Sequence, residues 1–519
     1  MSRKSGSRRK GPRGAAARPA APRPAEPPAH QPVLPRLRWQ LAAVAAVFIA
    51  ANAAGLAGGF VLDDLPLIVD NVRLHELGAI PGHFSSTLWP DRPGLALYRP
   101  LTQTLWTLLW HAGGGAPFVF HLFNLVAGAV VPLLLLLLLR GLRVGPAAAL
   151  AAALLFAAMP IHTEATASVV GSAELLAAGF GLGSVLALVR GRDWLAILLF
   201  VPAVLSKEHA AALIVVGWMV AGPGRMRRWK TGVAAALVLL TAYWLRSRVA
   251  DGWPVVPVID NPASILPAGP RVLTAPWVQC LYVWKTFLPI TLSADYSYKQ
   301  IPLVMGMADP RAWAGLALVT VSAAALWRAR PPVRGLVVAY WALALPTANL
   351  LVPVGTVMGE RLAYLPSAAL AGLAGLGLAA AVRSKPRAAW TLLALFLLVF
   401  GARSTARTLD WRSADVFYPR LVETSPGSAK SHYFYGAYLA ARGNDQGAVA
   451  AYDRAIAIFP AYTEAFHNRG NALARLGKFD QAAASYQIVL RFDPGHAGAR
   501  QNLAAIGQGI RINPPRKRM

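Results

Sequence analysis

The chain has 519 residues, of which 56% are hydrophobic and only 14% are charged. Soluble domains average about 25% charged residues, so this depletion argues against a soluble enzyme and for a multi-pass membrane protein. A formal net charge of +28 would suit a nucleic-acid-binding protein. The basic residues, however, lie in short clusters between apolar runs, which is the pattern that lipid bilayers select.

The first 36 residues are rich in Arg, Pro and Ala, with Glu26 as their one acid. This composition predicts a disordered basic tail on the cytoplasmic side of a membrane. The apolar run at 37–57 is too long for a signal-peptide core and is interpreted as an uncleaved first span. A lone cysteine, Cys280, excludes intrachain disulfides and CxxC metal sites.

Eleven apolar runs predict an all-α, polytopic domain over 37–405, with outer loop regions at 58–117 and 248–310. Basic clusters occupy every second connection, so the positive-inside rule predicts a cytoplasmic N-terminus and an extracytoplasmic C-terminus. The run at 273–290, rich in Trp and Tyr, would break this alternation and is interpreted as a helix lying at the outer interface. The runs are 37–57, 118–139, 146–160, 171–189, 193–206, 209–221, 230–247, 311–327, 335–351, 362–382 and 388–402.

This topology brings five polar clusters to the outer side, where they are expected to line one cavity. Charged groups at the ends of spans are common, so each cluster alone is weak evidence of function. Their motifs are DD at 63–64, HTE at 162–164, KEH at 207–209, DYSY at 295–298 and GER at 359–361.

Asp63 and Asp64 follow the first span directly. One of them could simply cap a helix that begins near Pro66, because Asp at an N-cap and Pro in the first turn are both favoured. The functional alternative is a general base at the membrane surface, which accepts the proton of an acceptor hydroxyl that attacks a sugar.

The other candidates also have ordinary explanations. Arg99 begins an amphipathic helix and could hold a phosphate as a planar fork. His162 and Glu164 could hold a metal ion, although helix capping explains Thr163–Glu164 equally well and no metal is assigned. Lys207 and Glu208 could form a self-compensated ion pair, and Glu360 with Arg361 begins a span; Arg361 is the better phosphate ligand of that pair.

A repeat with a period of 34 residues occupies the predicted domain at 411–510, before a basic tail at 511–519. Residues 428–460 align with 462–494, and matching pairs include Gly436 with Gly470 and Tyr452 with Tyr486. A preceding half repeat contains Tyr418. The period and the small-residue pattern are those of tetratricopeptide repeats, which form an α-solenoid. The pattern does not distinguish a concave surface that binds a peptide from one that binds nothing.

Taken in order, VLDD, YRPLTQ, FHLFNL, HTEATASVVGSAELLAA, LSKEHA, LSADYSY, MGERLAYLPS and the repeats resemble the transmembrane and tetratricopeptide repeat-containing O-mannosyltransferases and their bacterial relatives. The resemblance covers about residues 37–510. It departs at Ser172, where the family pattern has Arg.

The resemblance implies a GT-C fold and an inverting glycosyltransferase. The enzyme would move mannose or another hexose from a polyprenyl-phosphate donor to an acceptor hydroxyl, such as Ser or Thr of an exported protein. Asp63 is then expected to be the base and Asp64 its orienting neighbour. The expected residues for substrate and donor phosphate are Arg99, His162, Glu164, Lys207, Glu208, Glu360 and Arg361.

The Ala- and Arg-rich composition is typical of bacteria, so undecaprenyl phosphate in an inner membrane is the expected carrier, with the active site and repeats on the periplasmic side. The acceptor is expected to reach the enzyme through the repeats, and no nucleic acid is involved. Two alternatives remain: a transporter of lipid-linked glycans, which would place polar groups at mid-span, and a membrane-anchored repeat scaffold for envelope assembly.

Overall fold

The computed structural model describes residues 36–89, 96–221, 229–250 and 255–515, together with Met1, Ser2, Gly6, Gly94 and Gly252. Most of the predicted tail at 1–36, most of the basic cluster at 225–230 and the last four residues of the tail at 511–519 lie outside them. The chain divides into two compact units, Met1–Val33 and Leu34–Met519. Only the second is described below.

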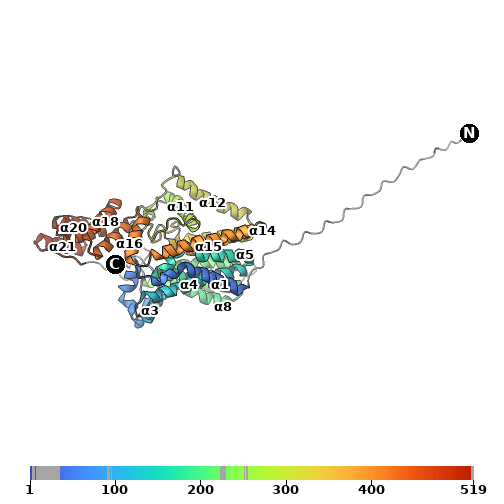
Figure 1. The fold of residues 1–519 in the computed structure, drawn as a ribbon, viewed down its shortest axis with the longest axis horizontal. Helices are drawn as coiled ribbons and strands as arrows, with labels where there is room; N and C mark the ends of the chain where they lie inside the picture. Colours follow the sequence, from blue (N-terminus) through green and yellow to red (C-terminus); the bar gives the residue numbers. More distant parts are fainter. Residues whose placement is uncertain are drawn as a thin grey trace. The chain divides into compact units, whose positions relative to one another are not determined.

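Every regular element in the described ranges is helical, as the apolar and repeat patterns predicted (Figure 1). The helices before residue 410 are α1 (Leu37–Asn52), α2 (Ile80–His83), α3 (Pro100–Gly113), α4 (Pro117–Gly141), α5 (Pro146–Ala158), α6 (Thr163–Ala167), α7 (Ser172–Val189), α8 (Asp193–Ser206), α9 (Leu213–Ala221), α10 (Trp229–Val249), α11 (Ala268–Phe287), α12 (Pro310–Arg328), α13 (Pro331–Ala344), α14 (Tyr364–Ser384) and α15 (Pro386–Leu409). The remaining helices are α16 (Ala414–Thr424), α17 (Ala429–Ala441), α18 (Asp445–Ile458), α19 (Thr463–Arg475), α20 (Phe479–Phe492) and α21 (Ala497–Gly507).

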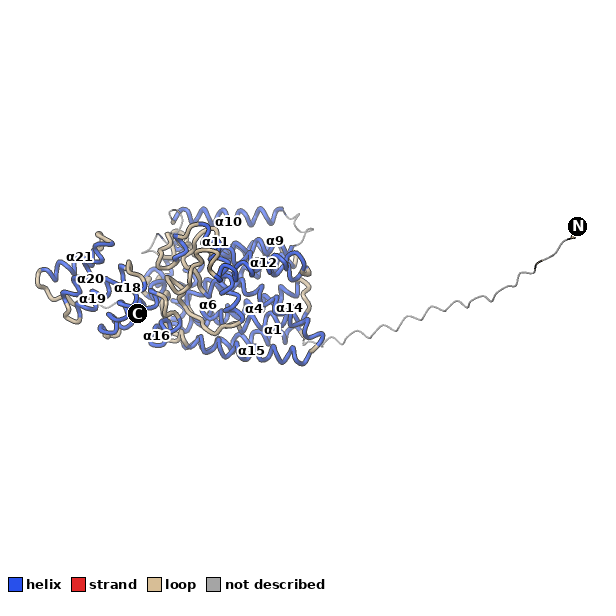
Figure 2. The backbone as a smooth tube through the Cα atoms, turned by 90° about the horizontal axis from the view of Figure 1, so that it is seen from above, coloured by secondary structure: helices blue, strands red, loops and turns tan. Residues whose placement is uncertain are grey.

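The alanine-rich α5 packs against α1, α4, α14 and α15. The long helices lie side by side, and the longer loops gather at one end of them (Figure 2). Residues 148–158 of α5 are all buried, because alanine side chains let neighbouring helices approach closely. Gly375 of α14 shows how close the contact is: a Cβ there would lie 2.4 Å from the carbonyl oxygen of Ala148. The apolar core of the domain is therefore a tight helix–helix interface.

Six helical segments in the described ranges are long and apolar enough to cross a membrane, or seven if the bent pair of 146–158 and 160–167 is one span. The expected count of eleven spans is therefore not confirmed. The runs at 193–206 and 209–221 form shorter apolar helices. The run at 311–327 lies in α12, and the run at 335–351 is α-helical only as far as Ala344 in α13. The run at 273–290 forms most of α11, which is not among the candidate spans.

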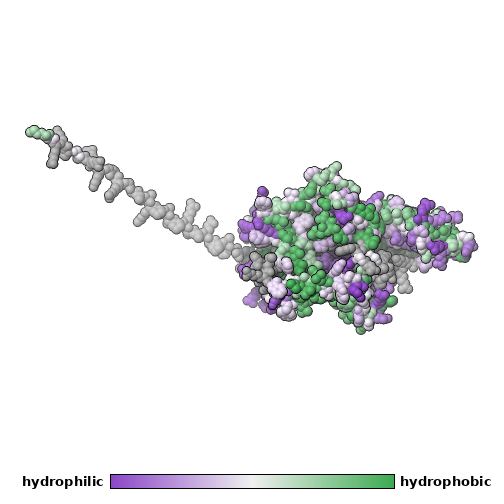
Figure 3. Space-filling view, turned by 180° about the vertical axis from the view of Figure 1, so that it is seen from behind, coloured by the Kyte–Doolittle hydropathy of each residue, from purple (hydrophilic) through white to green (hydrophobic). Residues whose placement is uncertain are grey.

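Large apolar side chains cover much of the outer surface of these helices (Figure 3). Trp194, Leu237 and Leu398, on three different helices, are each more than half exposed. A surface of this size and composition is stable only in contact with lipid, because soluble monomers rarely expose such large apolar patches. The chain is therefore a multi-pass membrane protein.

The C-terminal helices form the expected antiparallel repeat pairs. Tyr452 of α18 packs on Gly436 of α17, and Tyr486 of α20 packs on Gly470 of α19; a Cβ on either glycine would lie within 2.8 Å of the tyrosine ring. The 34-residue period thus produces the same close contact twice. These repeats are tetratricopeptide repeats.

Candidate functional site

The two aspartates of the first loop lie in different environments. The Asp64 side chain is fully buried, and its carboxylate accepts hydrogen bonds from the backbone N–H groups of Val61 at 3.2 Å and Val170 at 2.9 Å. The hydroxyl of Ser168 lies 3.4 Å from the same carboxylate. Asp63, in contrast, keeps 34% of its side chain exposed. Asp64 therefore holds the loop, and Asp63 is the carboxylate that a ligand can reach.

The carboxyl group of Asp64 does not cap a helix. The chain enters a single π-helical turn at Leu65–Val69, and the Asp64 side chain makes no capping hydrogen bond to it. Burial raises the pKa of Asp64 to about 7, although the hydrogen bonds from Val170 and Val61 act to lower it. Asp64 thus sits near its titration point at neutral pH. The capping interpretation is wrong for this residue.

Arg361 joins Asp63 to Glu164. Its Nη1 lies 3.7 Å from Oδ2 of Asp63, and its Nε lies 3.5 Å from Oε1 of Glu164. The backbone N–H of Arg361 also donates to Oε2 of Glu164 at 2.9 Å. Glu164 belongs to the short helix α6, and Arg361 to the turn that begins α14. Three of the predicted site residues, from three separate motifs, therefore meet.

Lys207 and Glu208 do not compensate each other as predicted, because each has another partner. Lys207 forms a buried ion pair with Glu174 of α7, and His209 Nε2 lies 3.4 Å from the same carboxylate. The Glu208 carboxylate accepts two hydrogen bonds from the Arg99 guanidinium, one from Nε at 3.0 Å and one from Nη2 at 2.7 Å. Lys207 and Arg99 are therefore already neutralised by carboxylates.

The last two predicted residues face other groups. His162 Nε2 lies 2.8 Å from the hydroxyl of Ser367, and its ring packs against Phe156 and Tyr364. This is a buried packing position. Glu360 accepts a hydrogen bond from the backbone N–H of Ser293 at 2.6 Å and another from the hydroxyl of Tyr296.

Ser172, the departure from the family pattern, also has a structural partner. Its hydroxyl accepts a hydrogen bond of 2.8 Å from the indole N–H of Trp106 on α3. Within the described ranges, no group of three or more His, Cys, Asp or Glu side chains has the arrangement of a metal site.

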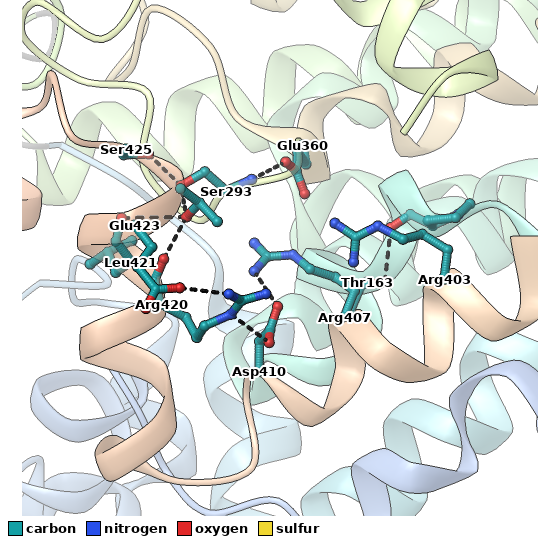
Figure 4. Close-up of polar contacts among 12 residues, drawn as sticks. Thr163, Ser293, Glu360, Arg403, Arg407, Asp410, Arg420, Leu421, Glu423 and Ser425 are labelled. Atoms are coloured by element: carbon teal, nitrogen blue, oxygen red, sulfur yellow. Dashed lines mark hydrogen bonds and ion pairs between the residues drawn. The ribbon is translucent and has the colours of Figure 1, made fainter. Parts of the chain in front are cut away.

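Two sets of polar contacts were not predicted from the sequence, although Asp295 belongs to the predicted cluster at 295–298. Asp295, in the LSADYSY segment, accepts hydrogen bonds from the hydroxyls of Ser428 and Ser431 at the start of the repeats. Asp410 lies between Arg407 and Arg420, at 3.2 and 3.3 Å (Figure 4). The serine partners of Asp295 are more than 130 residues away in the chain, so no local pattern indicates them, whereas Arg407 is only three residues before Asp410.

Comparison with known proteins finds similarity to one family of proteins. The profile described as "Protein O-mannosyl-transferase TMTC, DUF1736" matches residues 251–323, which contain α11 and the LSADYSY segment. Profiles of tetratricopeptide repeats match residues 436–477 and 463–496.

Curated relatives match most of the chain. Protein O-mannosyl-transferase TMTC3 of Mus musculus is 27% identical over 88% of this chain and 56% of its own length. TMTC4 of the same organism is 28% identical over 81% of this chain and 66% of its own. TMTC1 of Homo sapiens is 26% identical over 80% and 54%. The chain thus spans little more than half the length of the first of these relatives.

Proposed function

Because the chain is related over most of its length to the TMTC protein O-mannosyl-transferases, we propose that it is a glycosyltransferase with Asp63 as its general base. The donor is a hexose, mannose in the first instance, linked to polyprenyl phosphate. The acceptor is a hydroxyl group, such as that of Ser or Thr in an exported protein. The single observation that carries the proposal is the partly exposed Asp63 carboxylate, held beside Arg361 by the buried Asp64.

The reaction follows from these positions. The acceptor hydroxyl gives its proton to the Asp63 carboxylate while its oxygen attacks the anomeric carbon of the sugar. The bond from that carbon to the phosphate oxygen breaks, and the phosphate leaves with the electron pair. Attack from the face opposite the phosphate inverts the anomeric centre. The step releases the glycosylated acceptor and polyprenyl phosphate, and it leaves the acceptor's proton on Asp63.

Arg361 is the best of the three predicted cations for the leaving phosphate. Its side chain is 33% exposed and adjoins Asp63, whereas the Lys207 side chain is 6% exposed and paired with Glu174. Arg99 is 15% exposed and already forms a two-pronged pair with Glu208. A guanidinium with room for a ligand suits a phosphate, because its planar fork donates two parallel hydrogen bonds.

The grouping of the long loops at one end of the helices supports a site on one side of the membrane. With the basic N-terminal tail in the cytoplasm, that side is the outer one, and the carrier enters laterally from the outer leaflet. A GT-C arrangement and undecaprenyl phosphate as the bacterial carrier belong to the same proposal.

Asp63→Asn tests the assignment. The variant keeps the shape of the side chain and removes the base, so transfer from labelled polyprenyl-phosphate mannose should fall about 10²- to 10⁴-fold. Membranes that contain the protein would be incubated with labelled mannose and glucose donors, with and without a chelator. Asp70→Asn, an exposed aspartate of the same loop, is the matched control and should stay near wild-type activity. Full transfer by Asp63→Asn would refute the assignment.

A further inference from the structure

The backbone just before Asp63 is strained. Leu62 has φ of 53°, in the left-handed region that side chains other than glycine rarely adopt. Such a conformation persists only where the surrounding structure holds it. Asp64 holds the segment from the side of α7, through Val61 and Val170.

Helix α16 holds the segment from the other side. Val61 is buried in an apolar cluster with Trp411, Phe417 and Tyr418, and Leu62 packs against the same cluster. The backbone N–H of Leu62 interacts with the Tyr418 hydroxyl. Close by, the N–H of Gly59 donates to the carbonyl oxygen of Arg412 at 3.0 Å.

Helix α16 is itself fixed to the membrane domain through Asp410 and through its C-terminal end. Just before it, Asp410 binds Arg407 of α15 and also Arg420 in the second half of α16 (Figure 4). At its end, the Thr424 hydroxyl donates to Ser293 at 3.0 Å, and the next residue, Ser425, donates to the carbonyl oxygen of Asp295 at 2.5 Å. A helix anchored in this way can fix the backbone of the loop that it covers.

We propose that Tyr418 is a positioning residue for Asp63: its hydroxyl holds the Leu62 amide and so keeps the Asp63 carboxylate beside Arg361. The inference rests on the proposed function, since it assigns Tyr418 to the same base. The half repeat thus supports the active site, and only the repeats after it are left for binding a peptide.

Repeat packing alone would explain a buried tyrosine at this position, because Tyr418, Tyr452 and Tyr486 are spaced 34 residues apart. The later two pack on glycines of the preceding helix. Tyr418 instead faces the Asp63 loop. Tyr452→Phe is therefore a matched control: it removes the same hydroxyl from an equally buried repeat tyrosine that is remote from the loop.

The test compares Tyr418→Phe with Tyr452→Phe in the full-length protein. Loss of the hydroxyl at 418 should lower kcat for sugar transfer about 10- to 100-fold, because small displacements of a catalytic group have effects of that size. The KM for the donor and the unfolding midpoint should match those of Tyr452→Phe. Equal kcat values for the two variants would overturn the proposal.

Hydrogen exchange gives a second readout that does not depend on activity. The amide of Leu62 should exchange faster in Tyr418→Phe than in wild type or Tyr452→Phe, as followed by mass spectrometry of peptides that cover residues 60–67. If wild type transfers no sugar from any donor, the proposed function fails, and the exchange rates still decide whether Tyr418 holds the loop. Unchanged exchange in Tyr418→Phe would refute that support.

Discussion

Two adjacent carboxylates with different surroundings have different chemistry. Asp64 is buried and receives backbone hydrogen bonds, whereas Asp63 is partly exposed beside a guanidinium. Burial favours the protonated form of an acid. For Asp64 the consequence is a dependence of stability on pH that can be measured.

Asp64→Asn should remove that dependence. The folded-state pKa of Asp64 is about 7, against an ordinary value of 3.8. Between these pH values the folded protein keeps a proton that the unfolded chain has lost, so this residue's contribution to stability falls as the pH rises from about 4 to about 7. Its full size is at most about 4 kcal/mol. The measurement is the unfolding midpoint of both proteins in detergent at several pH values.

Only the slopes of the two curves bear on this prediction. The amide that Asp64→Asn introduces would lie among backbone N–H donors, so the variant protein loses stability at every pH. This displaces its whole curve of unfolding midpoint against pH. Wild type should lose stability relative to the variant as the pH rises to 7. If the unfolding midpoints of the two proteins changed with pH in parallel, the raised pKa of Asp64 would be contradicted.

The charged motifs of the site could be predicted from the sequence, but most of their partners could not. Lys207 has extended backbone angles, with φ of −159° and ψ of 131°, and successive side chains of an extended segment point in opposite directions. Lys207 and Glu208 are therefore neighbours in the chain, yet they reach Glu174 and Arg99. The pairing of Arg361 with Asp63 depends on contacts between distant segments, which no local pattern records.

At the scale of elements, apolar periodicity predicts helices well and membrane spans less well. Each expected run lies at a helix, because backbone hydrogen bonding in an apolar setting favours that structure. Breaks divide the runs: α5 and α6 are bent by 51° at Pro160, and an extended Lys207 separates α8 from the next turn. Several helices are consequently shorter than a bilayer requires.

The turn between α6 and α7 is an element on which the site depends. A Cβ on Gly171 would lie 2.2 Å from the carbonyl oxygen of Ala165, so Gly171→Ala forces apart the backbone that carries Glu164 and Val170. We expect a loss of about 1–3 kcal/mol in stability, together with lower transfer activity. Thermal unfolding in detergent measures the first effect.

Gly179→Ala, in the helix α7 that follows this turn, is the matched control. A Cβ there meets no atom within 4 Å, and alanine is favoured over glycine inside a helix by about 1 kcal/mol. This variant should be as stable as wild type or more so. Equal destabilisation by the two substitutions would show that the close contact at Gly171 has no special role.

At the scale of the whole second unit, the LSADYSY segment connects the membrane domain to the repeats. The repeats themselves could be predicted from their period, but not this docking, since Asp295 and Ser428 lie in different domains. Asp295 binds Ser428 and Ser431, and Lys430 pairs with Asp260 at 2.5 Å. The repeats are thereby fixed to the loop region that the family profile matches.

Asp295→Ala should loosen this connection. Loss of its two serine hydrogen bonds costs about 1–2 kcal/mol, which corresponds to roughly 5- to 30-fold more of the undocked state. Limited proteolysis near residues 425–431 should accelerate by that factor. Asp453→Ala, which removes an exposed ion pair with Arg469 inside the repeats, should leave the cleavage rate there unchanged, and equal rates for the two variants would contradict the docking role.

The position of α16 in the chain also has a consequence for biosynthesis. The loop with Asp63 leaves the ribosome early, whereas α16 follows the last apolar helix. A nascent chain can therefore insert its whole hydrophobic portion while its acidic loop is still without its cover. Under the proposed function, the chain would become competent for sugar transfer only after translation has passed residue 424, so an incompletely synthesised copy in the membrane would not use the proposed lipid-linked donor.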